Sequence, residues 1–201
     1  MNWNVPNILT LIRIGAIPLL MGLFFIPGWP GYLASTVVFV LAAITDWVDG
    51  YWARRYEQTS AFGAFLDPVA DKLMVATALV LLTADGRAPA ILTVIIIGRE
   101  ITISALREWM AELGKRAAVA VSWMGKLKTA AQMVAIVLLL LHEPIQGVDV
   151  HLWGLGLLTL AAVLTLWSMI LYLKAALPIL LSGEESPAEG SGSPAGGRGG
   201  P

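Results

Sequence analysis

The chain has no cysteine and little charge, and these two shortages exclude whole classes of protein. Without cysteine, neither a disulfide framework nor a thiol-based metal or catalytic centre can form. Lys, Arg, Asp and Glu make up only 13% of the 201 residues, and the formal net charge of -1 provides no basic field for nucleic acid. We therefore expect no nucleic-acid partner.

Hydrophobic residues are abundant instead, at 57% of the chain, and the mean hydropathy is +0.76. Six apolar stretches stand out, at residues 9–25, 32–45, 69–84, 88–106, 130–141 and 152–173. Several are shorter than the roughly 20 residues that a bilayer requires, so their helices should extend into polar flanks. The composition therefore predicts an all-α, polytopic membrane protein with six transmembrane helices.

The two ends of the chain differ in character. The first apolar stretch has no charged segment before it, so we expect it to be retained as the first span rather than removed as a signal peptide. Residues 178–201 are rich in Gly, Ser, Pro and Glu and are expected to form a disordered tail. The predicted catalytic domain is residues 1–177.

Lysine and arginine in short loops mark the cytoplasmic side of a membrane protein. With the amino terminus inside, that side holds Arg54, Arg55, Lys72, Arg107, Lys115, Arg116, Lys126, Lys128 and Lys174. The opposite loops carry only Arg87, together with His142 and His151. We therefore expect both termini to face the cytoplasm.

Acidic residues gather around one short basic loop on that side. Asp46 and Asp49 lie three residues apart, and Gly50 and Ala53 continue the same helical face. After the loop, Gly63, Asp67 and Asp71 recur at steps of four. Because proline favours the first position of a helix, Pro68 predicts that Asp67 caps the third helix.

Four carboxylates in a low-dielectric setting repel one another and are costly to desolvate, so cations should lie between them. Mg²⁺ or Mn²⁺ prefers such an all-oxygen ligand set. Two divalent ions would neutralise the four acids and leave positions for phosphate oxygens, while small residues nearby would let a bulky ligand approach the backbone. Arg54 is placed to pair with a phosphate or a carboxylate. The segment from Asp46 to Asp71 is therefore the predicted active site.

The pattern D-x-x-D-G-x-x-A-R-x8-G-x3-D-x3-D, which begins at Asp46, resembles the signature of the CDP-alcohol phosphatidyltransferases without a departure. The resemblance implies a homodimer of six-helix chains with two metal ions. It assigns Asp46, Asp49, Asp67 and Asp71 as metal ligands, and Asp71 also as the general base. The cytidine diphosphate site that it implies comprises Asp49, Gly50, Ala53, Arg54 and Gly63.

The amino-terminal stretch 7–13 is also similar to that family, in which its polar residues approach the nucleotide. On this basis Asn7 is a further candidate for the nucleotide site. From the residues alone, Asn7 could equally cap the first helix.

The acceptor alcohol must be recognised outside the shared motif. A phosphate-bearing acceptor would need basic partners near the metals, and the candidates are Arg99, Arg107, Lys126 and Lys128. Their alternative role is topological, as positive-inside residues or lipid-headgroup ligands. Since Lys126 and Lys128 would point about 200° apart on a helix, only one should reach the site, and we favour Lys126.

Residues 98–115 and 121–129 closely resemble the bacterial phosphatidylglycerophosphate synthases. The resemblance implies that the phosphatidyl group of CDP-diacylglycerol is transferred to sn-glycerol 3-phosphate, giving phosphatidylglycerophosphate and CMP for anionic phospholipid biosynthesis. Asp71 would deprotonate the acceptor's 1-hydroxyl, while the donor's acyl chains remain in membrane lipid.

Three alternatives remain open at this point. A family member could use another acceptor, such as inositol phosphate or serine. A membrane prenyltransferase also uses acidic motifs and Mg²⁺, although its motifs usually lie on well-separated helices. A cation transporter would place its carboxylates near mid-span, whereas these acids lie at predicted helix ends.

Overall fold

The computed structural model describes residues 5–56, 61–112, 123–144 and 147–182. Within these ranges the chain forms six α-helices, as the sequence predicts. They are α1 (Val5–Phe24), α2 (Trp29–Tyr56), α3 (Ala61–Ala84), α4 (Ala90–Glu112), α5 (Trp123–Leu141) and α6 (Val150–Ser182). The helix α6 continues past residue 177, where the catalytic domain is predicted to end, and residues 183–201 of the predicted tail lie outside the described part.

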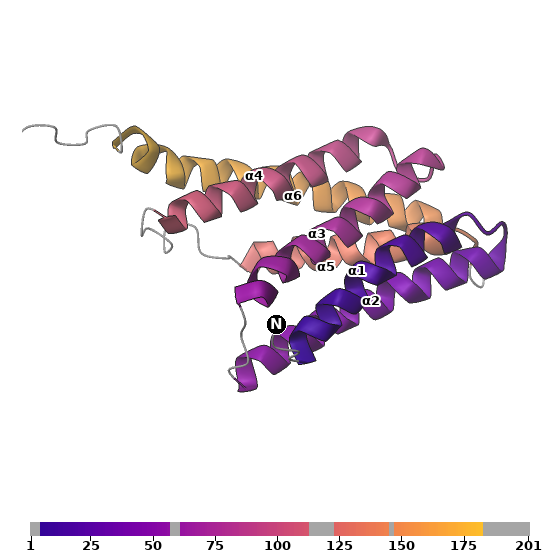
Figure 1. The fold of residues 1–201 in the computed structure, drawn as a ribbon. Coiled ribbons are helices and arrows are strands. Elements are labelled where there is room, and N and C mark those ends of the chain that lie inside the picture. Colours follow the sequence, from indigo (N-terminus) through magenta and orange to yellow (C-terminus); the bar gives the residue numbers. More distant parts are fainter. Residues whose placement is uncertain (1–4, 57–60, 113–122, 145–146, 183–201) are drawn as a thin grey trace, which may run out of the picture.

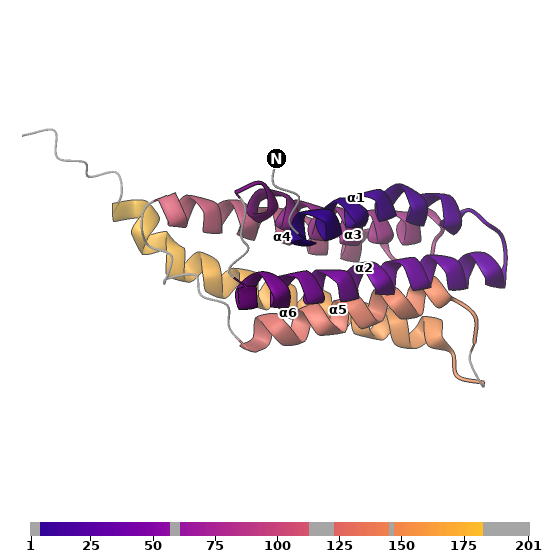
Figure 2. The same ribbon diagram turned by 60° about the horizontal axis from the view of Figure 1, so that its bottom comes forward.

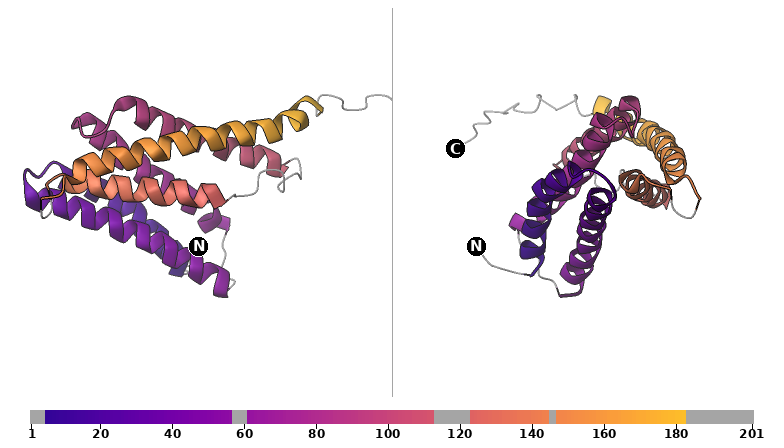
Figure 3. Two further views of the ribbon diagram at one scale, coloured as in Figure 1. Left: turned by 180° about the vertical axis from the view of Figure 1, so that it is seen from behind. Right: turned by 90° about the vertical axis from the view of Figure 1, so that its right-hand side faces the viewer.

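The helices form a two-layered bundle, with α1, α3 and α4 in one layer and α2, α5 and α6 in the other (Figure 2). Within the layers α1 contacts α3, α3 contacts α4, α2 contacts α5 and α5 contacts α6. The layers meet chiefly where α1 contacts α2 and where α4 contacts α6. Viewed nearly along the helices, α5 and α6 stand side by side (Figure 3, right).

Three connections lie together at one end of the bundle, which we call the turn end (Figure 1). They join α1 to α2, α3 to α4, and α5 to α6, and they contain Gly28, Gly86 and Gly147 with φ of 79°, 74° and 83°. Glycine adopts this left-handed backbone without the steric penalty that a Cβ brings. The opposite end, called the motif end, holds the last turns of α2 and the first turns of α3.

The core fills the space between the layers with aliphatic and aromatic side chains. Leu20, Phe39, Leu79 and Leu139 are almost fully buried there. The outer faces are apolar too, with Leu41, Val94, Leu152 and Val163 all more than half exposed. An apolar exterior is stable in lipid but not in water, so it indicates a surface that faces the bilayer.

Among the described residues, three helices are long and apolar enough to cross a membrane: α1, α2 and α6, over Asn7–Phe24, Trp29–Asp46 and Val150–Lys174. By helix length and composition the chain is thus a membrane protein. The helices α3 and α4 contain more charged residues than these three spans, and the apolar part of α5, Leu127–Leu141, is shorter. The polar flank 46–54 belongs to α2, as the sequence predicts.

One local prediction is wrong. The helix α3 begins at Ala61, so Asp67 and Pro68 lie inside it and Asp67 is not its cap. Proline lacks one backbone N–H and its ring crowds the preceding turn, yet the helix tolerates it here as α1 tolerates Pro18. As a consequence Gly63, Asp67 and Asp71 share one helical face over two full turns.

Candidate active site

The acids of the predicted motif come from two helices at the motif end. Asp46 lies on α2, and Asp67 and Asp71 lie on α3, all three partly buried. Gly63 is buried on α3. The predicted residues Asp49, Gly50, Ala53 and Arg54 belong to α2, but their side chains lie outside the described part of the structure.

The helix α1 supplies two polar side chains that hold these acids. Arg13, only 2% exposed, donates from Nη1 to Oδ1 of Asp46 over 2.7 Å. The hydroxyl of Thr10, which is fully buried, donates to Oδ1 of Asp67. One face of α1 therefore contacts a carboxylate on each of the two motif helices, and it fixes how the two acids are oriented.

The polar residues of α1 follow one another at steps of three, as Asn7, Thr10 and Arg13, and all are buried. Asn7 lies inside α1, so it does not cap the helix. The site residues predicted from sequence include Asn7 but omit Thr10 and Arg13. Polar residues at helical spacing inside an otherwise apolar span could have identified Thr10 and Arg13 from the sequence. Polar side chains within membrane spans are rare and usually functional.

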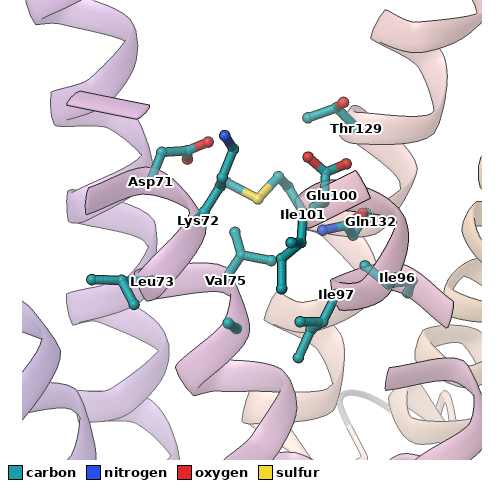
Figure 4. A pocket seen from close by; sticks show the side chains of 12 residues that line it. Asp71, Lys72, Leu73, Val75, Ile96, Ile97, Glu100, Ile101, Thr129 and Gln132 are labelled. Atoms are coloured by element: carbon teal, nitrogen blue, oxygen red, sulfur yellow. The ribbon is translucent and has the colours of Figure 1, made fainter. Parts of the chain in front are cut away.

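A cavity of about 220 Å³ opens beside Asp71, between α3, α4 and α5 (Figure 4). Its polar lining consists of Asp71 and Lys72 from α3, Glu100 from α4, and Thr129 and Gln132 from α5. The remaining lining is largely aliphatic, from Leu73, Val75, Ala76, Ile96, Ile97, Ile101 and Met133. Pockets for drug-sized ligands usually measure about 300–1,000 Å³, so this cavity suits a smaller ligand.

Glu100, which lines this cavity, contacts two buried cations. Oε1 of Glu100 accepts from Nη1 of Arg99 over 2.8 Å and from Nζ of Lys128 over 3.1 Å. Arg99 is 5% exposed and Lys128 only 3%. One carboxylate therefore pairs with two cations, and the group of three keeps a net charge of +1.

A second basic group lies further along α4. Arg107, which is exposed, donates from Nη2 to the hydroxyl of Tyr172 on α6 over 3.4 Å. Of the predicted acceptor residues, the structure thus joins Arg99 and Lys128 through Glu100 and places Arg107 two turns from Arg99. The side chain of Lys126 lies outside the described part, so the preference for Lys126 over Lys128 stays a prediction.

The donor set fits a hard divalent cation, because carboxylate oxygens from α2 and α3 are what Mg²⁺ and Mn²⁺ prefer. Among the acids whose side chains the structure describes, no three lie close enough together to form a metal site. Asp46 and Asp67 are held instead by Arg13 and Thr10. The side chain of Asp49, the remaining predicted ligand, is not among those described.

A sequence model described as CDP-alcohol phosphatidyltransferase matches residues 3–180. The chain belongs to this family. The match includes α1 to α5, all of α6 but its last two residues, and the whole segment from Asp46 to Asp71. The resemblance seen in the motif is therefore confirmed, and a prenyltransferase or an ion transporter no longer accounts for the acids.

Curated relatives within the family narrow the comparison. A protein of Salmonella choleraesuis named CDP-diacylglycerol--glycerol-3-phosphate 3-phosphatidyltransferase is 52% identical over 88% of this chain and 96% of its own length. The protein of the same name from Escherichia coli K12 is 51% identical over 90% of this chain and 99% of its own. Alignments of this length necessarily include α4 and α5, where the acceptor candidates lie.

Proposed function

We propose that this membrane enzyme transfers the phosphatidyl group of CDP-diacylglycerol to sn-glycerol 3-phosphate, releasing CMP and phosphatidylglycerophosphate for anionic phospholipid biosynthesis. The names of the relatives support this substrate pair. The observation that carries the choice of acceptor is the pair of buried cations, Arg99 and Lys128, which adjoin the Asp71 cavity through Glu100. A phosphate-bearing alcohol brings about two negative charges and requires such partners more strongly than zwitterionic serine, which has a single carboxylate.

In this proposal Asp46, Asp49, Asp67 and Asp71 hold two divalent cations, Mg²⁺ or Mn²⁺. When bound, the ions would neutralise the donor's pyrophosphate and position it for in-line transfer. Arg13 and Thr10 keep Asp46 and Asp67 in fixed rotamers, so the ligand oxygens are oriented before any substrate arrives. Preorganised charge of this kind is usually the largest contribution to catalysis in a dry site.

The nucleotide half of the donor is assigned to α1, α2 and the start of α3. The proposed contacts are Asn7, Asp49, Gly50, Ala53, Arg54 and Gly63. Support comes from the burial of Asn7 and Gly63 on helix faces next to the acids. The diacylglycerol half would remain in membrane lipid alongside the apolar outer faces.

Asp71 is the proposed general base. Its carboxylate lines the cavity beside Lys72 and opposite Glu100, so an alcohol bound there has an acceptor for its proton (Figure 4). Asp71 takes the proton of the 1-hydroxyl as that oxygen bonds to the lipid-side phosphorus. The phosphorus–oxygen bond to CMP breaks in the same transfer. Arg99, Arg107, Lys126 and Lys128 hold the acceptor's phosphate.

The wider organisation is part of the proposal. All six helices would cross the bacterial inner membrane as one catalytic domain, residues 1–177, with residues 178–201 as a tail. The motif end and both termini would face the cytoplasm, where CMP is released. Two chains would form a homodimer.

The decisive experiment is an acceptor panel with purified enzyme, Mg²⁺ and radiolabelled CDP-diacylglycerol. We expect labelled phosphatidylglycerophosphate from glycerol 3-phosphate and no lipid product from inositol phosphate or serine. Preferential turnover of another alcohol would refute the acceptor, and no CDP-diacylglycerol consumption with any alcohol would refute the activity. Chelation with EDTA should abolish turnover, and Mg²⁺ or Mn²⁺ should restore it.

The base is tested with Asp71→Asn, which preserves shape but cannot accept the proton as a carboxylate. We expect activity below about one thousandth of wild type, since general base and ligand roles are lost together. Asp149→Asn is the matched control at the turn end. Oδ1 of Asp149 accepts from the backbone N–H of Leu152 at the start of α6, and asparagine caps a helix equally well. Near-normal turnover of Asp71→Asn would remove Asp71 from the mechanism.

A further inference from the structure

Tyr172 on α6 lies between two arginines that come from a different helix. Its side chain is buried, with 8% of the residue exposed. The guanidinium carbon of Arg99 lies 6.0 Å from the ring centroid and that of Arg107 lies 5.5 Å from it. A guanidinium within about 6 Å of an aromatic ring is attracted by the ring's negative face. One ring therefore interacts with both cations.

Side-chain hydroxyls of α6 also accept hydrogen bonds from the same two arginines. Nη2 of Arg107 donates to the hydroxyl of Tyr172, and Nη2 of Arg99 donates to Oγ of Ser168 over 3.2 Å. Ser168 and Tyr172 lie four residues apart, so they occupy one face of α6. Oγ of Ser168 in turn donates to the backbone oxygen of Thr165, which fixes the serine rotamer.

The helix α4 presents its arginines in matching register. Arg99, Ile103 and Arg107 follow at steps of four, and Ile103 packs with Tyr172 and Met110 in a small apolar cluster. This cluster packs α4 against α6 next to the two arginines. Long arginine side chains lose much rotamer freedom when ordered, so a ring that orders both before binding lowers the cost of binding a phosphate.

We infer that Tyr172 is a positioning residue for acceptor recognition, which holds the Arg99 and Arg107 guanidinium groups so that they bind the phosphate of the acceptor alcohol. The inference rests on the proposed function, because it presumes that these arginines bind that phosphate. Tyr172 itself acts through the arginines and takes no part in the chemical step. Its loss should therefore change the KM for the acceptor and leave kcat and the KM for CDP-diacylglycerol unchanged.

The test compares Tyr172→Leu and Tyr172→Phe in the purified full-length enzyme. Leucine keeps an apolar side chain but loses both ring contacts, and we expect the KM for glycerol 3-phosphate to rise about 5- to 30-fold. Phenylalanine keeps the ring and loses only the long hydrogen bond, so the rise should be about 2- to 3-fold. The inhibition constant of inorganic phosphate, which probes the cations alone, should rise by the same factors.

The matched control is Tyr32→Leu. Tyr32 also has a buried arginine over its ring, Arg87 at 4.4 Å, but at the turn end of the bundle. Its loss should lower thermal stability about as much as Tyr172→Leu does, without any effect on the acceptor KM. If Tyr172→Leu loses stability and kcat while its acceptor KM stays within twofold of wild type, Tyr172 is only a packing residue and the inference is wrong.

Arg99→Met and Arg107→Met separate this inference from the proposed function. If both variants leave the acceptor KM and phosphate inhibition unchanged, the acceptor site is misassigned and the proposal fails at that step. If the arginine variants raise the acceptor KM and Tyr172→Leu does not, the inference about Tyr172 alone is refuted. Parallel increases in all three variants support both.

Discussion

The helices α5 and α6 pack closely at a glycine, Gly154, and the structure predicts how its replacement changes the stability of the protein. Gly154 is buried on α6, and a Cβ added there would lie 2.9 Å from Cγ of Leu139, 3.0 Å from its Cδ2 and 3.3 Å from Cβ of Leu138. Gly156, one of its neighbours on the same helix, is exposed, and a Cβ there meets no atom within 4 Å. The two glycines differ only in what surrounds them.

Gly156→Ala should stabilise the protein by up to about 1 kcal/mol, because alanine restricts the unfolded chain and favours helix. Gly154→Ala gains the same stabilisation, but its added methyl group overpacks the interface between α5 and α6, which typically costs about 1–3 kcal/mol. Leu139 offers little relief, because its Cγ, close to the backbone, is among the clashing atoms and its side chain is fully buried. We therefore expect Gly154→Ala to be less stable than Gly156→Ala by about 1–3 kcal/mol.

The assay is thermal unfolding of both variants and wild type in one detergent, followed by tryptophan fluorescence. At roughly 2–4 °C per kcal/mol for a chain of this size, the two midpoints should differ by about 2–12 °C, with Gly156→Ala the higher. Equal midpoints, or a higher one for Gly154→Ala, would show that α5 and α6 do not approach as closely as described. Unchanged acceptor KM in both variants would show that the change stays local.

Two further predictions concern the two ends of the bundle. Arg13→Met should lower kcat/KM about 5- to 30-fold. This factor corresponds to the loss of about 1–2 kcal/mol from a charge-assisted hydrogen bond to Asp46, a half-exposed carboxylate. Unchanged kcat/KM would show that Arg13 does not orient Asp46. At the turn end, burial lowers the pKa of His142, and the nearby Arg87 and His151 lower it further against the opposing charges of Asp85 and Glu143. The pKa of His142 is therefore lower in the folded than in the unfolded state. Protonation of His142 then favours unfolding, so the protein should keep its stability above about pH 6.5 and lose stability as the pH drops below that value. Asparagine tolerates the positive φ of 59° at this position. In His142→Asn the melting temperature should therefore fall less steeply between pH 7 and pH 5 than in wild type. An equally steep fall in the variant would show that His142 does not cause the pH dependence.

The local properties of the chain were predictable from its sequence. Apolar runs predict helices because a chain in lipid must satisfy its backbone hydrogen bonds internally, and the described part of the chain contains six helices. The family was predictable because its motif depends on residue types at fixed spacing along two helices. The error at Asp67 and Pro68 has a local cause as well, since the preference of proline for a helix start is a tendency that α3 overrides.

Contacts between helices were decided only by the tertiary structure. The sequence places Arg13 in an apolar span, but its pairing with Asp46 depends on how α1 packs on α2. Likewise Lys128 joins Arg99 through Glu100, and Ser168 and Tyr172 meet the arginines of α4, because α5 and α6 pack where they do. Periodicity shows which residues share a face of one helix, and it carries no information on which other helix that face meets. The motif acids and the arginines of α4 could therefore be named from sequence alone, whereas the side chains that contact Asp46, Asp67 and these arginines could not.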